Sequence, residues 1–406
     1  MNGGASSALD SLRDRADRVL MHTYTRQPLA IQSGHGAWVR DAEGRELLDL
    51  VGGIGVNVLG HSHPAVATAL ADQAANLIHT SNLYYTTPQV ELAERLVATA
   101  FDGRVFLCNS GTEANEAAIK LVRKWGRQHR GGATAIVALR GGFHGRTLGA
   151  LAATSQRRYR EPFEPLPAGF KHVAADLDAI TSAADDSVAA VLLEPIQGES
   201  GVVPLPDGLI AAVRSLCDER DLLLVVDEVQ SGMGRTGRWW AHQHVGVTPD
   251  VMTVAKGLGG GVPVGAVLAG PRADVLEPGD HGSTFGGNPL VAAVACAVLR
   301  TIEDEKLVDR AARVGEYLRE SLLSLRSDGV PVSTVRGRGL MLGLVLDEPI
   351  AVRAGRAALD CGVIVNSIGT SVLRMLPALT ITEEEIDEAL RRLRQAFDIA
   401  LTEGGA

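Results

Sequence analysis

Short, continuous apolar runs alternate with helical patterns between about residues 104 and 270, and this alternation constrains the fold more than any other feature. The runs occupy residues 105–108, 135–139, 188–195, 222–228, 250–256 and 265–270. Apolar runs of this length between helices are typical of strands buried on both faces of a mostly parallel sheet. We therefore predict an α/β fold with a mostly parallel central sheet covered by helices. Ligands of such folds bind beyond the carboxyl ends of the strands, where the polar residues of this chain are Ser110, Glu194, Asp227 and Lys256.

The patterns divide the chain into three parts. Residues 1–60 predict a helix and a short strand meander, which we expect to pack with the small domain. Residues 61–289 hold the alternating pattern and form the predicted large, ligand-binding domain. Residues 290–406 predict a smaller α+β domain.

The small domain has its own local signals. One long helical stretch is predicted from about Pro289 to Leu325, and two strand candidates follow at 333–346 and 371–379. A final helix opens at Thr382, where a glutamate three residues further on gives the spacing of a capping box.

Composition excludes several classes of protein. Lysine plus arginine total 39 against 48 aspartate plus glutamate, so the net charge of −9 argues against a nucleic-acid partner. The longest apolar run, residues 290–299, is about half of what a membrane span needs, so no membrane partner is expected. The N-terminus lacks the apolar core of a signal peptide, and the four cysteines have no metal-like spacing. We expect a cytoplasmic protein with no metal site.

Lys256 stands out because the chain has only five lysines among its 39 basic residues. It ends an apolar strand pattern, where desolvation would lower the pKa of its ammonium group. A lysine with a lowered pKa is a nucleophile that forms imines, whereas an arginine stays protonated and cannot. The alternative is a lysine whose ammonium group extends from the strand end to solvent. Position alone leaves both interpretations open.

Asp227 closes a very apolar run, so its carboxylate needs a cationic or hydrogen-bonding partner. A metal carboxylate of the Walker-B kind would require a GxxxxGK[ST] loop, which the sequence lacks. Pairing with a buried arginine is a second interpretation. The third is a bond to the protonated ring nitrogen of pyridoxal phosphate, opposite the lysine that holds the cofactor.

The Asn109-Ser110-Gly111-Thr112 turn joins a strand pattern to a helical pattern. Backbone N–H groups and hydroxyls converge at such a helix N-terminus, which suits a phosphate group. An ordinary N-cap by Ser110 or Thr112 is the alternative.

Three other patterns favour structural roles. A GxGxxG spelling at 232–237 lies too far from its strand for a dinucleotide-binding turn. His61 and His63 have no nearby carboxylate in the sequence, which favours a turn with solvent-facing rings over a metal pair. The QRRYR segment at 156–160 favours a solvated loop over an RNA-binding surface.

An imine-forming lysine, a partner for a ring nitrogen and a phosphate cradle together fit pyridoxal phosphate, and the sequence also resembles a known family. It is similar to the class III, ornithine-type aminotransferases, which are fold-type I pyridoxal-phosphate enzymes. The resemblance extends from about Arg40 to Glu388. Its longer segments are GVNVLGHSHP (55–64), FLCNSGTEANEAAIKL (106–121), FHGRTLGALAAT (143–154), EPIQGESGVV (194–203), DEVQSGMGRTG (227–237), AKGLGGGVPVGA (255–266) and HGSTFGGNP (281–289).

The resemblance implies how the cofactor is bound. Lys256 matches the lysine that forms the Schiff base and moves the proton, and Asp227 matches the partner of the ring nitrogen. We expect Val229 and Phe143 on the two ring faces and Gln230 at the ring hydroxyl. The remaining expected cofactor contacts are Ser110, Gly111, Thr112, Glu194 and, from the neighbouring subunit, Thr284. A site shared in this way makes a homodimer the expected assembly.

The resemblance also implies how two unlike substrates are bound. Arg146, with Ser283 nearby, matches the position that binds the distal carboxylate of both. Arg374 matches the arginine that binds the α-carboxylate of glutamate. Glu199 matches the residue that neutralises this arginine when an ω-amino substrate is present. Ile54 matches a position where ornithine δ-aminotransferases have a tyrosine that contacts the free α-amine, so an acylated amine fits better here.

We therefore expect transfer of the terminal amino group of N-acetylornithine to 2-oxoglutarate, giving N-acetylglutamate 5-semialdehyde and glutamate, in arginine biosynthesis. Succinyl-diaminopimelate, ornithine and 4-aminobutyrate remain alternative amino donors. An aminomutase on the same fold and a nicotinamide-dependent oxidoreductase are the alternatives from other classes of enzyme.

Overall fold

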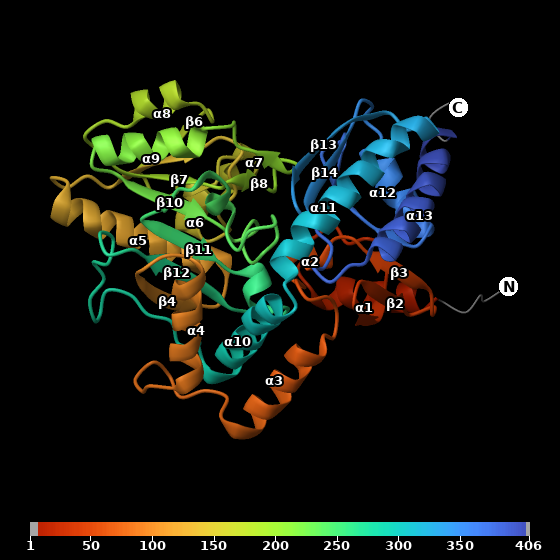
Figure 1. The fold of residues 1–406 in the computed structure, drawn as a ribbon, viewed down its shortest axis with the longest axis horizontal. Coiled ribbons are helices and arrows are strands. Elements are labelled where there is room, and N and C mark those ends of the chain that lie inside the picture. Colours follow the sequence, from red (N-terminus) through yellow and green to blue (C-terminus); the bar gives the residue numbers. More distant parts are fainter. Residues whose placement is uncertain (1–6, 403–406) are drawn as a thin grey trace.

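The computed structural model describes residues 7–402, which form two lobes (Figure 1). The large lobe is built on a central sheet that has seven strands within the described residues. Its strands are, in spatial order, β4 (Arg104–Cys108), β12 (Gly265–Ala269), β11 (Val251–Val254), β10 (Leu223–Asp227), β7 (Val188–Leu193), β5 (Ala135–Leu139) and β6 (Phe170–Val173). Only β12 is antiparallel to its neighbours in this sheet. The predicted α/β fold with a mostly parallel sheet is confirmed.

Helices cover both faces of the central sheet. They include α4 (Thr87–Thr99), α5 (Gly111–His129), α6 (Leu148–Ala153), α7 (Arg157–Arg160), α8 (Leu177–Ala183), α9 (Leu209–Glu219), η1 (Glu161–Phe163), η2 (Ala241–Val245) and η3 (Lys256–Gly259). Along β10, Leu223 and Val225 pack with α5, whereas Leu224 and Val226 pack with α8 and α9. Successive strand residues point to opposite faces, so a sheet covered on both sides needs the continuous apolar runs seen in the sequence.

The second lobe combines the two ends of the described chain, drawn in red and blue in Figure 1. One sheet pairs β1 (Ile31–His35), β2 (Trp38–Asp41) and β3 (Glu46–Asp49) with β15 (Val363–Ile364), which is parallel to β3. A second sheet has the order β13 (Val332–Arg338), β14 (Met341–Leu346), β17 (Val372–Met375) and β16 (Asn366–Ile368). This shared sheet supports the proposal that residues 1–60 belong with the small domain.

The remaining elements complete or connect the lobes. They are α1 (Ala8–Val19), α2 (Gly52–Gly55), α3 (Pro64–Asn76), α10 (Pro289–Asp304), α11 (Leu307–Ser324), η4 (Leu325–Asp328), α12 (Ala351–Asp360), α13 (Glu383–Thr402) and the small hairpin β8 (Ile196–Gln197) with β9 (Val203–Pro204). Helix α10 packs against α3, α4 and η3, and also against α11, which follows it in the chain. None of the described helices is both long and apolar enough to span a membrane.

Some sequence predictions need correction. The stretch from Pro289 to Leu325 is two helices, because Lys306 has a left-handed backbone (φ 53°) between α10 and α11. The 333–346 candidate is a hairpin, β13 and β14, rather than one strand. Strand β6 was not predicted, because its sequence FKHV interrupts the apolar pattern; Lys171 lies in this edge strand and pairs with Asp185.

The capping box of the last helix is confirmed. The backbone N–H of Thr382 donates to Glu385 Oε2 at 2.9 Å, and the backbone N–H of Glu385 donates to Thr382 Oγ1 at 3.1 Å. These reciprocal bonds satisfy N–H groups at the start of α13 that have no partner within the helix.

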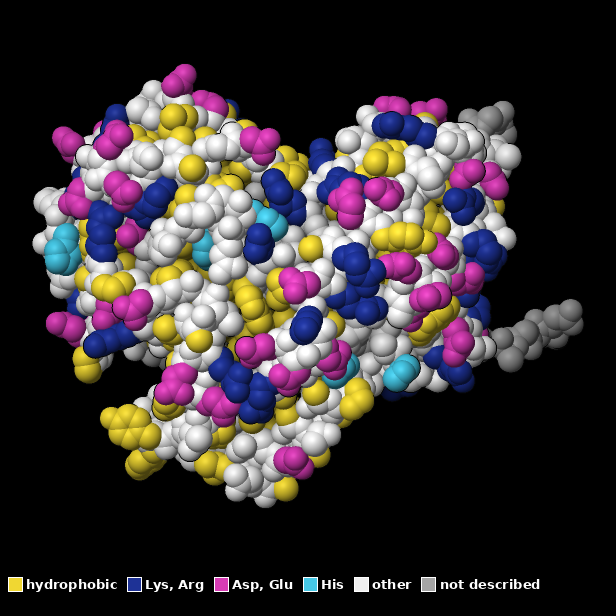
Figure 2. All heavy atoms as spheres, in the orientation of Figure 1, with side chains coloured by type: hydrophobic (Ala, Val, Ile, Leu, Met, Phe, Trp, Pro, Cys, Tyr) yellow, Lys and Arg dark blue, Asp and Glu magenta, His cyan; other side chains and the backbone are white. Residues whose placement is uncertain are grey.

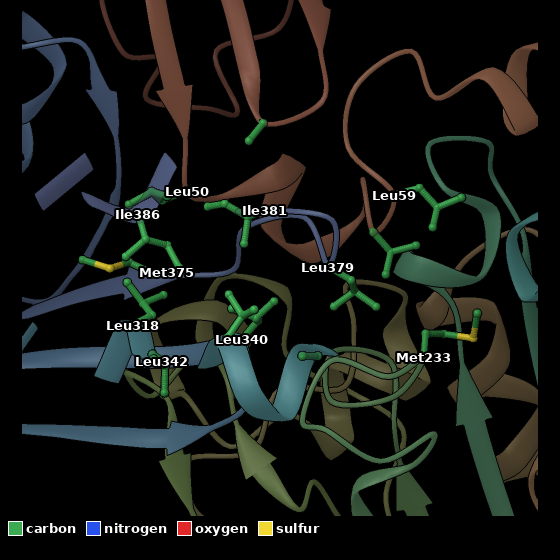
Figure 3. Close-up of a cluster of buried hydrophobic side chains, with 14 of the residues drawn as sticks. Leu50, Leu59, Met233, Leu318, Leu340, Leu342, Met375, Leu379, Ile381 and Ile386 are labelled. Carbon is green, nitrogen blue, oxygen red and sulfur yellow. The ribbon is translucent and has the colours of Figure 1, made fainter. Parts of the chain in front are cut away.

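A continuous hydrophobic core joins the two lobes. Its side chains come from the first strands, from the loop after β10 and from the C-terminal elements (Figure 3). The residues labelled there are Leu50, Leu59, Met233, Leu318, Leu340, Leu342, Met375, Leu379, Ile381 and Ile386. Because one packed core spans the junction, the small lobe is held in a fixed position beside the strand ends of the large lobe.

Candidate active site

A cavity of about 410 Å³ lies beyond the carboxyl ends of β5, β7, β10 and β11, beside the N-terminus of α5. Ten of the residues predicted to form the site line it: Ser110, Gly111, Thr112, Phe143, Arg146, Glu194, Asp227, Val229, Gln230 and Lys256. Lining residues that sequence reasoning did not single out include Val56, Asn115, His144 and the 261–264 turn. The strand-end rule therefore predicts the position of the cavity from the sequence.

Lys256 leaves β11 in a left-handed backbone conformation, with φ 38°. Such a conformation costs about 1–3 kcal/mol in a residue other than glycine, and it occurs most often at functional sites. Burial lowers the pKa of Lys256, and the charge of Arg374 lowers it further, while the carboxylates of Glu199, Glu194 and Asp227 oppose these effects. A lysine with a lowered pKa is more often unprotonated at neutral pH and can act as a nucleophile or a base.

Asp227 is 3% exposed and ends β10. Its Oδ2 accepts a hydrogen bond from Asn115 Nδ2 and lies 2.8 Å from His144 Nδ1, and its Oδ1 accepts the N–H of Val229 at 3.0 Å. The interpretation that Asp227 pairs with a buried arginine is therefore wrong. Thr253 Oγ1 in turn donates to Asn115 Oδ1 at 3.0 Å, which fixes the amide orientation.

His144 was not predicted, although it directly follows Phe143 in the 143–154 segment. Burial disfavours its charged form, but the bond to Asp227 and the nearby Glu194 outweigh this, so the pKa of His144 is raised. Its Nε2 is buried without a hydrogen-bond partner among the described residues. A protonated His144 donates from Nδ1 to Asp227 in a charge-assisted hydrogen bond.

Glu194 is a second buried carboxyl group at the cavity, 6% exposed. Its Oε1 accepts the backbone N–H of Phe143 at 2.8 Å. Burial raises the pKa of Glu194 to about 7; Asp227 adds to this rise, while His144 and Lys256 oppose it. Burial of this carboxyl group beside the apolar cavity therefore favours its protonated form.

The N-terminus of α5 forms one end of the cavity. Ser110 is the N-cap, and its Oγ accepts the N–H of Glu113 at 3.3 Å. Thr112 Oγ1 accepts the N–H groups of Arg146 and Thr147 at 3.2 and 3.3 Å. A Cβ atom at Gly111 would lie 2.8 Å from Val229 Cγ1, so a larger residue here would push the Val229 side chain from its position at the cavity. The N-cap interpretation holds for Ser110, and the first N–H groups of the helix still face the cavity end.

Arg146 and Tyr159 form a stacked pair at the cavity. The guanidinium carbon of Arg146 lies 3.9 Å from the centre of the Tyr159 ring and 5.5 Å from that of Phe143. Tyr159 contacts Phe143 edge-to-face, with ring centres 6.1 Å apart. The QRRYR segment was predicted as a solvated loop, but its Tyr159 stacks on Arg146, which lines the cavity. This contact could not be predicted, because the two residues are not linked by any pattern in the sequence.

Arg374 is 2% exposed and lies on β17, beside rather than on the wall of the cavity. Its Nη1 donates to Glu199 Oε1 at 2.6 Å and to Gln230 Oε1 at 3.2 Å. Its Nε and Nη2 both donate to Asn366 Oδ1. Burial raises the pKa of Glu199, but Arg374 outweighs this and the pKa is lowered. Asn366 was missed, because its position opposite Arg374 depends on strand pairing.

Ser283 and Thr284 do not line this cavity within one chain. They line a second cavity of about 320 Å³, together with Asn109 and Phe285. Asn109 lines both cavities, and its Nδ2 donates to Ser283 Oγ at 3.1 Å. Ser283 and Arg146, predicted to be near one another, are thus on different cavities of the same chain. Ile54 does not line the main cavity either.

The other sequence patterns have structural roles. The glycines at 232–237 lie in the loop after Asp227, where no dinucleotide-binding helix follows. His61 is not a solvent-facing ring, because its Nε2 lies 2.8 Å from Asp49 Oδ2. No group of three or more metal-ligating side chains occurs among residues 7–402.

Comparison with known proteins decides the family. Residues 20–397 match the model of the class-III aminotransferases. The chain belongs to this family. It is 51% identical over 404 residues to the acetylornithine aminotransferase of Mycobacterium tuberculosis (strain H37Rv), covering 98% of this chain and 99% of the relative. It is 48% identical over 378 residues to that of Caldanaerobacter subterraneus subsp. tengcongensis, covering 93% and 96%.

Solved structures of aminotransferases have the same fold as this chain. An ornithine aminotransferase from Toxoplasma gondii with partial occupancy of pyridoxal phosphate matches with a TM-score of 0.93 and 33% identity, covering 98% of this chain and 96% of that one. The N-acetylornithine aminotransferase from Stenotrophomonas maltophilia matches with a TM-score of 0.82 and 43% identity, covering 94% and 98%. The chain is a pyridoxal-phosphate-dependent transaminase of fold type I.

The residues present fit this cofactor. The α5 N-terminus offers N–H donors that would hold a phosphate, and Asp227 offers a buried carboxylate that would bind a ring nitrogen. Lys256 would supply the amine that attaches to the cofactor. When bound, pyridoxal phosphate supplies a conjugated ring that takes up the electron pair left when a C–H bond beside the amino group breaks.

The Glu194→Gln variant tests the environment of this cavity. The folded protein binds a proton at Glu194 up to about pH 7, whereas the unfolded chain loses it near the ordinary value of 4.5, so this residue lowers stability as pH rises between them. Glutamine can still accept the N–H of Phe143 but does not ionise. We expect the variant to gain stability over the parent on the order of 1–3 kcal/mol at pH 8 and little at pH 5.

Thermal unfolding of both proteins from pH 5 to 8 measures this difference. An exposed Glu305→Gln variant is the control. A difference between parent and Glu194→Gln that stays constant with pH would contradict the described environment of Glu194.

Proposed function

We propose that this class-III aminotransferase transfers the terminal amino group of N-acetylornithine to 2-oxoglutarate in arginine biosynthesis, and that it acts in the cytoplasm. The identity of about half of all residues to acetylornithine aminotransferases over almost the whole chain supports this amino donor. The observation that carries the ω-amino class is the pair of Arg374 and Glu199 beside Lys256, because it supplies an arginine that can be free or neutralised.

The proton transfers are assigned to Lys256. Its lowered pKa favours the unprotonated amine, which can accept the proton from the carbon that bears the amino group and return it elsewhere. Asp227, which Asn115 and His144 hold in place, would stabilise a positive charge on the ring nitrogen of the cofactor. Thr112 and the first N–H groups of α5 bind the phosphate, and Gln230 contacts the ring hydroxyl. Val229 and Phe143 pack on the ring faces.

The two substrates differ at the reacting carbon. Glutamate carries a carboxylate there, whereas the terminal CH₂ of N-acetylornithine carries none. We assign Arg374 to the α-carboxylate of glutamate, and Glu199 to neutralising Arg374 when N-acetylornithine is bound. We assign Arg146, stacked on Tyr159, to the distal carboxylate that both substrates have.

We further propose that the enzyme is a homodimer and that Thr284 and Ser283 complete the site of the partner. These residues lie on a second cavity, away from Lys256 of their own chain. Large hydrophobic side chains are exposed around this region, including Ile78, Leu83, Tyr84, Tyr85 (98% exposed) and Phe285. Figure 2 shows hydrophobic side chains gathered at the lower edge, over the segment that precedes α4. Exposed apolar patches of this kind are typical of protein–protein interfaces.

Steady-state kinetics with a fixed concentration of 2-oxoglutarate test the amino donor. We expect kcat/KM for N-acetylornithine to exceed that for ornithine and 4-aminobutyrate by about tenfold or more, since the acyl group replaces a charged amine in an apolar environment. Succinyl-diaminopimelate is measured alongside. A higher kcat/KM for any of the three alternatives would reject N-acetylornithine as the preferred donor.

Sedimentation velocity tests the assembly. We expect the enzyme to sediment with twice the mass of one chain at micromolar concentration, because one chain leaves the patch at residues 78–85 uncovered. A Tyr85→Asp variant is expected to shift the equilibrium toward monomer. A parent protein that is monomeric and fully active would contradict the shared site.

A further inference from the structure

The guanidinium of Arg374 is held by one charged and two neutral side-chain oxygens. The Glu199 carboxylate and the Gln230 amide oxygen accept from Nη1, whereas the amide oxygen of Asn366 accepts from Nε and Nη2. We propose that Asn366 is a specificity-determining positioning residue: it fixes Arg374 by its Nε edge without neutralising it, so that the Nη1–Nη2 end keeps its charge for the α-carboxylate of glutamate and 2-oxoglutarate. This inference rests on the proposed role of Arg374.

Strand pairing puts the amide in place. Strands β16 and β17 are antiparallel, and Asn366 is the direct cross-strand partner of Arg374. Directly paired residues point to the same face of a sheet, with Cβ atoms about 4.5–5.5 Å apart. On the other side of β17 the paired residue is Gly343, which has no side chain to compete for the guanidinium. The register therefore gives Arg374 one side-chain neighbour within its own sheet, and that neighbour is Asn366.

The hydrogen bonds show which N–H groups of the guanidinium are already bound by Asn366. Asn366 Oδ1 accepts Nε–H at 3.1 Å and Nη2–H at 2.7 Å, which occupies one of the two edges that could bind a carboxylate through two bonds. Nη2 carries a second hydrogen, and within residues 7–402 it has no acceptor other than Asn366. Nη1 donates to Glu199 Oε1 at 2.6 Å and, at longer distances, to Gln230 Oε1 and the carbonyl oxygen of Gly198. A carboxylate that binds the Nη1–Nη2 end would therefore displace Glu199 from the shortest of these bonds.

The charges explain why the fixed partner is an amide. The Arg374 side chain is 2% exposed, whereas Glu199 (27% exposed, on the loop after β8) and Asn366 are both half-buried. Of these two partners, Glu199 is the one that carries charge. A buried arginine between two carboxylates would be more than neutralised, and a substrate carboxylate would then meet net negative charge. With an amide at position 366, removal of Glu199 leaves one full positive charge.

The Asn366→Asp variant separates charge from shape. Aspartate has nearly the same size and keeps an acceptor for Nε and Nη2, but it adds a negative charge. We expect KM for glutamate and for 2-oxoglutarate to rise by about tenfold or more, and kcat/KM for the N-acetylornithine half-reaction to change by less than about twofold. Single-turnover absorbance changes of the bound cofactor measure each half-reaction separately.

Binding without reaction provides an independent readout. Glutarate is a five-carbon dicarboxylate with no group that can react, and its dissociation constant is measured from the absorbance of the cofactor in the holoenzyme. We expect Asn366→Asp to raise this dissociation constant by about the same factor as it raises the Michaelis constant for the oxo-acid substrate. Asn366→Ala removes the acceptor without adding charge, and it should weaken glutarate binding less than Asn366→Asp does.

Two controls make the outcomes distinct. Ser367→Ala removes a neighbouring bond of β16, from Ser367 Oγ to the carbonyl oxygen of Ala351, and should leave both half-reactions unchanged. Arg374→Ala should impair the glutamate half-reaction far more than the N-acetylornithine half-reaction; if it impairs neither or both equally, the proposed role of Arg374 fails. If Arg374→Ala behaves as expected but Asn366→Asp affects both half-reactions equally, affects neither, or binds glutarate more tightly than Asn366→Ala, the inference about Asn366 is wrong.

Discussion

The burial of the Asp227 carboxylate at the end of β10 is the constraint on which the rest of the site depends. A carboxylate in that position must be given hydrogen bonds, and it receives them from Asn115 on α5 and from His144 in the loop after β5. These two bonds join three separate elements at one atom. They therefore set the position of the N-terminal end of α5 relative to Lys256, and the cavity takes its shape from that arrangement.

The second lobe contributes a charged residue beside the cavity. Arg374 reaches the cavity edge from β17, and the continuous core between the lobes holds that strand beside Lys256. Arg374 lowers the pKa of the lysine and Glu199 raises it, so the state of this ion pair also affects the proton-transferring group. The Arg374–Glu199 pair, to which we assign substrate recognition, and Lys256 are in this way electrostatically connected.

The features that depend on local sequence pattern could be predicted, whereas those that depend on contacts between distant residues could not. Apolar runs located the strand ends, and from them Lys256 and Asp227, because burial on both faces leaves a visible pattern. Tyr159 was assigned to a solvated loop and Asn366 was not noticed, because ring stacking and cross-strand register join residues that are distant in the chain. Strand β6 was missed because Lys171 interrupts its apolar pattern.

Covalent labelling tests the central claim most directly. Borohydride fixes a cofactor bound through a lysine, and the mass of the peptides after digestion identifies which lysine carries it. The account predicts that the cofactor mass is found on Lys256, the one lysine at this cavity among the described residues. A cofactor mass on Lys120, Lys124, Lys171 or Lys306, or full transaminase activity in a Lys256→Ala variant, would contradict it.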